Sequence, residues 1–280
     1  MKVRLLTSLG IAVLGLPLLI FSEYIVYPIA LGLLAAVSSW ELLRVFGLHK
    51  RVLLCVPTYI LAALLPFFSY GAFFPSEKQS TYLLILALAD FAYLLFLAGY
   101  SVLSRGRFTF ADMAKVFTTV TYVVVSFTSM SLIRYMNNGV YLFEMIFIGA
   151  WVCDSFAYFT GRLLGKHKLA PELSPKKTVE GSIGGMAFTV GAFALYGFII
   201  ESVSSLDANY LILCLTGLCL SVVSQIGDLF ASLIKREHGV KDYSRILPGH
   251  GGIMDRFDSV LIVAPVLLII CVIFAPFTAA

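Results

Sequence analysis

Long apolar runs, separated by short polar segments, repeat along the whole sequence of 280 residues. A helix of about 20 apolar residues is long enough to cross the roughly 30 Å hydrocarbon layer of a bilayer. We expect nine such spans: Leu5–Ile20, Tyr24–Val45, Val52–Phe74, Tyr82–Leu103, Val116–Ile133, Tyr141–Leu164, Ile183–Ile200, Tyr210–Ile234 and Val260–Phe277. The pattern predicts an all-α fold, a polytopic membrane bundle of about nine transmembrane helices.

The first apolar run follows Lys2 and Arg4, as the hydrophobic core of a signal peptide also would. A small-residue cleavage site does not follow it, and the second run begins almost at once. We therefore expect a retained first helix.

Positive charges are distributed very unevenly between the loops. With the N-terminus inside, only Lys78 and Arg134 of the 20 Lys and Arg residues fall outside, which leaves 18 inside. Cytoplasmic loops of membrane proteins are enriched in Lys and Arg, so the N-terminus is predicted to be cytoplasmic.

Composition agrees with a membrane protein and excludes other classes. The chain is 60% hydrophobic and 13% charged, and a soluble domain this apolar would expose large hydrophobic patches and aggregate. The net charge of +4 fits attraction to anionic membrane lipids. Because no basic stripe with interleaved aromatic residues occurs, we expect no nucleic-acid partner.

The N-terminal half offers little chemistry. Glu41 and Arg44, three residues apart, are expected to pair on one helix face. Asp90 is an intramembrane carboxylate for which structural packing or an unrecognised helix partner is expected, although a functional role is the alternative. The five cysteines show no metal-binding spacing and are expected to pack as small hydrophobes. We therefore divide the chain into N-terminal transmembrane helices (1–140) and a C-terminal catalytic region (141–280).

The strongest chemical pattern lies between residues 221 and 258. Ser221, Ser224, Asp228 and Ser232 form a polar stripe at helical spacing. Asp255 and Asp258 are three residues apart, so one helical turn directs both to the same side. Three carboxylates brought together repel one another unless a cation holds them, and oxygen-only ligands favour Mg²⁺.

The glycines between these acids suit an anion. Gly249, Gly251 and Gly252 permit close backbone approach, so their N–H groups could cradle a phosphate. The alternative is that the acids pair with nearby cations at the membrane surface. Those cations are Arg236, Lys241, Arg245 and Arg256.

Two upstream segments are also rich in polar groups. Asp154 lies in an apolar span and needs a partner there. The segment from Gly161 to Lys166 has the wrong glycine spacing for a P-loop. Residues 174–181 carry adjacent lysines, including Lys177, and Glu180; they could bind phosphate or could be an ordinary positive-inside loop.

The order of residues between Ser232 and Asp258 is distinctive. It reads Ser232-Leu-Ile-Lys235-Arg236, then Lys241-Asp242, then Pro248-Gly-His-Gly-Gly-Ile-Met-Asp-Arg-Phe-Asp258. This pattern resembles the signature of phosphatidate cytidylyltransferases, also called CDP-diacylglycerol synthases. The segments around Asp154 and from Ser174 to Gly181 are similar to a second block of that family, so specific similarity covers about residues 151–258.

The resemblance implies an enzyme that converts CTP and phosphatidic acid to CDP-diacylglycerol and pyrophosphate. It implies Mg²⁺ held by Asp228, Asp255 and Asp258, with a second cation left open. The implied catalytic residues are Asp228, Asp255, Asp258, Lys241 and His250. The implied substrate-binding residues are Ser224, Ser232, Lys235, Arg236, Lys177, Gly249, Gly251, Gly252 and Arg256. Asp154 and Glu180 are further candidates.

The implied partners are CTP, phosphatidic acid and membrane lipids, with a homodimer left open. The expected location is the inner or plasma membrane, with the active site on the cytoplasmic face. One alternative is a related CTP-dependent polyprenol or lipid kinase, which would share the phosphate chemistry. A transporter is the other alternative, but its site should lie near mid-membrane on broken helices.

Overall fold

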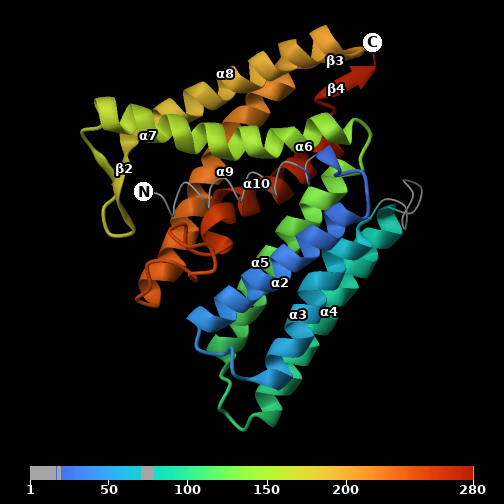
Figure 1. Ribbon diagram of the computed structural model, residues 1–280, viewed down its shortest axis with the longest axis vertical. Coiled ribbons are helices and arrows are strands. Elements are labelled where there is room, and N and C mark those ends of the chain that lie inside the picture. The colour runs from blue at the N-terminus through green and yellow to red at the C-terminus, as the bar shows by residue number, and fades with distance from the viewer. Residues whose placement is uncertain (1–16, 18–19, 71–78, 280) are drawn as a thin grey trace. The chain divides into compact units, whose positions relative to one another are not determined.

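The computed structural model describes residues 17, 20–70 and 79–279 (Figure 1). Its helices are α2 (Val26–Val45), α3 (Val52–Phe68), α4 (Gln79–Leu103), α5 (Phe110–Arg134), α6 (Gly139–Phe147), the π-helical turn η2 (Ile148–Val152), α7 (Cys153–Leu164), α8 (Val179–Val203), α9 (Tyr210–Glu237) and α10 (Met254–Ile273). Its four short strands are β1 (Lys168–Ala170), β2 (Ser174–Thr178), β3 (Leu206–Ala208) and β4 (Phe277–Ala279). Antiparallel pairing joins β1 to β2 and β3 to β4. The predicted all-α class is confirmed.

The apolar helices agree with the predicted spans. In the described ranges, seven helical segments are long and apolar enough to cross a membrane, and α3 is a shorter apolar helix. These segments correspond to eight of the nine expected spans. The first expected span, Leu5–Ile20, lies almost entirely outside the described residues, so the number nine and the position of the N-terminus stay predictions.

Polar residues start several helices where the apolar pattern alone would leave the boundary uncertain. Thr109 and Asp112 form a capping box at the start of α5, with each side chain accepting the other residue's backbone N–H. The Thr178 side chain accepts the N–H of Gly181 at the start of α8, and the Asn209 side chain accepts the N–H of Ile212 at the start of α9. These caps fix the helix ends next to the polar loops.

The chain divides into two compact units. The first contains residues up to Tyr135 together with Val240–Arg256, and the second contains Met136–Gly239 and the segment from Phe257 onward. The segment Val240–Arg256 thus joins the N-terminal helices, although it is far from them in sequence.

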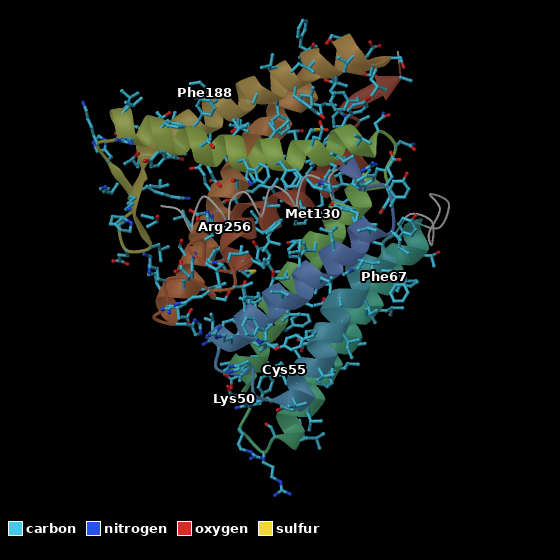
Figure 2. All side chains as sticks on the ribbon, in the orientation of Figure 1. Lys50, Cys55, Phe67, Met130, Phe188 and Arg256 are labelled. Atoms are coloured by element: carbon cyan, nitrogen blue, oxygen red, sulfur yellow. The ribbon has the colours of Figure 1, made fainter. Side chains whose placement is uncertain are left out.

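In the first unit, α2 and α3 run side by side (Figure 1). They approach closely at Gly32, where a Cβ atom would lie 2.3 Å from the carbonyl oxygen of Ala63. On α5, Met130 is buried (Figure 2). The Asp90 carboxylate accepts a 2.7 Å hydrogen bond from Thr121 on α5, so the expected helix partner of this intramembrane acid is confirmed.

The predicted Glu41–Arg44 pair is wrong. The Arg44 guanidinium lies over the Trp40 ring, 5.3 Å from its centroid. Glu41 is fully buried and accepts a 2.5 Å hydrogen bond from Ser244, 203 positions further along the chain. Burial of this face of α2 therefore gives Glu41 a distant partner in place of the neighbouring cation.

In the second unit, α7 and α8 lie side by side (Figure 1). Gly181 and Gly185 make this close packing possible, because Cβ atoms there would lie 2.6 Å from the Ala157 carbonyl and 2.9 Å from the Cys153 carbonyl. Small residues four apart are a common contact between membrane helices. Next to them Phe188, labelled in Figure 2, stacks on Phe156 with ring centroids 4.1 Å apart.

Candidate functional site

Three carboxylates of the second unit form one electrostatic cluster. Asp154 belongs to the first turn of α7, Asp228 to α9, and Asp258 to the beginning of α10. Each of these acids interacts electrostatically with the other two. The π-helical turn η2 ends immediately before Asp154's helix, and such turns are frequent at functional sites.

Close helix packing brings this acid cluster together. A Cβ atom at Gly227 would lie 2.9 Å from the carbonyl oxygen of Asp258, so the absence of a side chain lets α9 approach α10. The hydroxyl of Ser259 donates to Asp154 at 2.7 Å, which ties α10 to α7. The Ser259 backbone N–H also donates to the Asp258 carboxylate at 2.9 Å.

Two lysines face the acid cluster. The Lys177 amine forms an ion pair with Asp228, and both side chains are largely buried, with exposed fractions of 24% and 25%. Lys235, two helical turns beyond Asp228 on α9, interacts favourably with Asp258. Lys177 lies near the end of β2, and the next residue, Thr178, pairs with Lys168 of β1.

A cavity of about 310 Å³ adjoins the Lys177–Asp228 pair. Polar and charged residues on four elements line much of it: Asp154, Arg162, Lys176, Lys177, Thr178, Ser182, Gln225 and Asp228. The cavity therefore combines carboxylates with cations, the composition that a metal-bound polyphosphate requires.

Asp255 belongs to the first unit, where its side chain bonds to the backbone of the loop that precedes α10. Its Oδ2 atom accepts the backbone N–H of Tyr243 at 2.8 Å and that of Gly252 at 2.9 Å. Gly251 has a φ of 83°, and a Cβ atom there would meet Asp255 at 2.7 Å. The Gly252 N–H that could have cradled a phosphate thus has the Asp255 carboxylate as its partner.

Lys241 lines a second cavity, which belongs wholly to the first unit. Its volume is about 460 Å³. It is lined by Arg44, Val45, Val240, Lys241, Asp242, Tyr243, Ser244 and Arg245. Three cations around one cavity suit an anionic ligand, and Arg44 and Arg245 were not among the predicted site residues.

The other predicted residues have varied surroundings. The Ser224 hydroxyl is buried one turn before Asp228 and has no hydrogen-bond partner in the described part of the chain. Ser232 is buried on the same helix. Arg236 donates to the carbonyl of Leu173 between β1 and β2 at 3.5 Å. Glu180 accepts the backbone N–H groups of Lys166 and His167, so it supports the segment before β1.

The remaining three lie in or beside the glycine-rich turn. Gly249 has a φ of 78°, and the His250 backbone donates to Leu247 at 2.9 Å, which makes the turn tight. Arg256, labelled in Figure 2, lies exposed in the first turn of α10. The roles predicted for these residues stay predictions.

Sequence reasoning missed Ser259, Gln225 and Glu41. Ser259 directly follows Asp258, and Gln225 directly follows Ser224, so both were adjacent to predicted residues. A polar residue beside a predicted ligand on an apolar helix was the available signal. Glu41 had no comparable signal, because its contacts lie more than 200 residues away.

The acid cluster offers oxygen atoms of the kind that Mg²⁺ prefers as ligands. Asp154, Asp228 and Asp258 supply hard oxygen donors, and the buried Ser224 hydroxyl is a further oxygen without a partner in the described residues. Among those residues, no three acidic, His or Cys side chains converge closely enough in this conformation to surround a metal. The cation in contact with Asp228 is the Lys177 amine.

Comparisons with known proteins identify the family of this chain. The model of the cytidylyltransferase family matches residues 2–274. A phosphatidate cytidylyltransferase of Bacillus subtilis (strain 168) is 38% identical over 280 residues, covering 98% of this chain and 99% of the relative. One of Staphylococcus haemolyticus (strain JCSC1435) is 36% identical over 279 residues, covering 97% and 99%. One of Staphylococcus saprophyticus is 42% identical over 177 residues, covering 63% and 65%.

Proposed function

This chain belongs to the cytidylyltransferase family, and we propose that it joins CTP to phosphatidate at the acid cluster of Asp154, Asp228 and Asp258. The chain is a membrane enzyme, a phosphatidate cytidylyltransferase of phospholipid synthesis, and its products are CDP-diacylglycerol and pyrophosphate. The observation that supports this location of the active site is the Lys177–Asp228 ion pair beside a cavity lined by further cations and acids.

The reaction is a direct displacement at phosphorus. A phosphate oxygen of phosphatidate bonds to the α-phosphorus of CTP, and the bond from that phosphorus to the bridging oxygen of the β-phosphate breaks. The electron pair leaves with pyrophosphate. Because a phosphate monoester is already largely dianionic near neutral pH, the attack needs neither a protein nucleophile nor a proton acceptor.

The residues of the cavity bind and orient these anions. Lys177 neutralises Asp228 in the structure, and its amine can be shared with a substrate phosphate. Arg162 and Lys176 on the cavity wall can hold the outer phosphates, because they line the same space. Alignment of two anions against their mutual repulsion is the main catalytic task.

We propose that Asp228 and Asp258 hold Mg²⁺, with Asp154 as a further oxygen donor. Asp255, the further ligand that the family resemblance implies, belongs to the first unit, and its role as a ligand stays a prediction. The bound ion would screen the phosphate oxyanions and stabilise the leaving pyrophosphate. The protein's own part is to keep these carboxylates together on three helices, which Gly227 and Ser259 do by close packing and hydrogen bonding.

Incubation of purified protein with α-³²P-labelled CTP, Mg²⁺ and phosphatidate tests the function. We expect label in the lipid extract and unlabelled pyrophosphate in the aqueous phase, since the α-phosphorus is the atom transferred. A parallel reaction with γ-labelled CTP should leave the lipid unlabelled. Label moving from the γ-phosphate to a lipid alcohol would instead identify a kinase.

We further propose that the protein lies in the plasma membrane with this site on the cytoplasmic side, where CTP is found. The charge distribution supports this orientation. Lys168 and Asp207 precede and follow α8, a single membrane-length helix, so they should face opposite sides.

Single cysteines test the orientation in a variant lacking the five native cysteines. In intact cells a cysteine at Asp207 should react with an impermeant thiol reagent, whereas one at Lys168 or Glu237 should react only after the cells are opened. Reaction of the Lys168 cysteine in intact cells would refute the orientation. The cysteine-free protein reports background labelling.

A further inference from the structure

Glu41 of α2 is a wholly buried carboxylate with three hydrogen-bond donors around it. The Ser244 hydroxyl donates to Oε1 at 2.5 Å, and the Ile253 backbone N–H donates to the same oxygen at 2.9 Å. The Met254 N–H donates to Oε2 at 2.8 Å. Every donor comes from residues 244–254, in the same unit as α2.

These contacts make Glu41 the cap of another helix. Ile253 and Met254 lie at the start of α10, where backbone N–H groups have no partner within the helix and favour a negative charge. A buried carboxylate without such donors would be strongly destabilising. Glu41 therefore supplies the acceptors that the start of α10 lacks, and these N–H groups in turn stabilise its carboxylate.

The glycine-rich turn is shaped around the same carboxylate. A Cβ atom at Gly252 would lie 2.2 Å from Glu41 Oε1, so any larger residue would displace the acid. Asp255 binds the two neighbouring backbone N–H groups, those of Tyr243 and Gly252. Glu41 and Asp255 together thus hold five polar hydrogens of residues 243–254.

The segment held in this way contributes Tyr243, Ser244 and Arg245 to the basic cavity of the first unit, and it directly follows Lys241 and Asp242, which line the same cavity. Lys241 and Arg245 lie on either side of Ser244 and Tyr243 in that lining. Arg44, one turn beyond Glu41 on α2, supplies the third cation. A shift of the Glu41 contacts would therefore move the cations of this cavity relative to one another.

We infer that Glu41 is a positioning residue for the cytidylyl transfer. Its buried carboxylate fixes residues 243–254 on α2 and so sets the places of Lys241 and Asp255, without touching either substrate. The substrate part of this inference rests on the proposed function and on the role that the family resemblance implies for Lys241, which we take to bind a substrate phosphate from the basic cavity of the first unit. The contrasting view makes Glu41 a general anchor of the fold.

Three variants separate these views. Glu41→Gln keeps an oxygen for Ser244 and Ile253 but turns an amide donor toward the Met254 N–H. Glu41→Met keeps the approximate length and removes every acceptor. Glu172→Gln, an exposed acid between β1 and β2, is the matched control.

Hydrogen exchange of the purified variants measures the loop directly, without substrate. In Glu41→Met we expect amides in a peptide covering residues 243–256 to exchange at least about tenfold faster, because two of them lose their acceptor. Peptides from α8 should exchange as in the unmodified protein. In Glu41→Gln, exchange of residues 243–256 should be faster than in the unmodified protein and slower than in Glu41→Met. Glu172→Gln should change exchange neither in this peptide nor in α8.

Kinetics then test the link to substrate. We expect Glu41→Gln to raise the KM of the same substrate whose KM rises in Lys241→Ala, by about tenfold, the scale of one charge-assisted hydrogen bond. The double variant should be little worse than Lys241→Ala alone, since both act through one cation. A general anchor would lower the amount of active enzyme and leave KM unchanged.

Unchanged loop exchange in Glu41→Met would overturn the inference. Equal acceleration in α8 and in residues 243–256 would also overturn it, as would a lower kcat with an unchanged KM for both substrates. If the unmodified protein joined no CTP to phosphatidate, the proposed function would fail, and the exchange experiment alone would decide whether Glu41 holds the loop.

Discussion

Replacing Asp228 with Asn is expected to reduce cytidylyl transfer by more than about a hundredfold, because groups that merely support a metal ligand already contribute 10- to 100-fold. The change keeps the size of the side chain and removes the charge that pairs with Lys177 and is proposed to hold Mg²⁺. Insertion into the membrane should persist, since the side chain is partly exposed and its backbone is helical. The measurement is kcat/KM of the purified variant across a Mg²⁺ titration.

Asp207→Asn is the control for this variant, because it removes an exposed acid of the same unit outside the site. It should retain full activity. Near-normal turnover of Asp228→Asn at matched protein level would remove Asp228 from the set of metal ligands. The Lys177–Asp228 pair would then be a structural contact.

Asp255→Asn should give a loss of similar size with an intact loop. The hydrogen bonds from the backbone N–H groups of Tyr243 and Gly252 end on one oxygen of Asp255, Oδ2, and the carbonyl oxygen of Asn can accept them too. What Asn lacks is the charge that a metal ligand needs. We therefore expect kcat/KM to fall by more than about a hundredfold, a scale set by supporting groups of metal sites.

Asp255→Ala provides the comparison, because it removes the charge and the acceptor together. Hydrogen exchange at Tyr243 and Gly252 should rise in the Ala variant and remain slow in the Asn variant. Activity of Asp255→Asn close to that of the unmodified enzyme would mean that this acid acts only by holding the loop.

The fold was largely predictable because apolar length is a direct consequence of the bilayer. The expected span Tyr210–Ile234 agrees with α9 (Tyr210–Glu237), and Tyr141–Leu164 agrees with the segment from α6 to α7. The π-helical turn η2 inside that segment could not be recognised from the hydrophobic pattern, since its residues are all apolar or small, like most of those in the helix before it. Strands β1, β3 and β4 were equally hard to predict, because three residues are too few to show alternation.

The site was predictable where its partners are local or share a helix stripe. Asp228 was identified from spacing on one helix, Lys235 from the family resemblance, and Asp154 from its cost in an apolar span. The link between Asp154 and Ser259 depends on how α7 meets α10, which spacing within either helix does not contain. Glu41 was misassigned for the same reason: Arg44 is near in sequence, and Ser244 is near in space.

The distance in sequence between Glu41 and Ser244 has a consequence for biosynthesis. The ribosome must add 203 further residues after Glu41 before the first of its hydrogen-bond donors exists. At 5–20 residues per second this takes roughly 10–40 s, during which α2 is already emerging into the membrane. An unpaired carboxylate is costly in lipid, so α2 should wait with its Glu41 end in contact with water. The contacts between Glu41 and residues 244–254 therefore form only when the ribosome is synthesising α10.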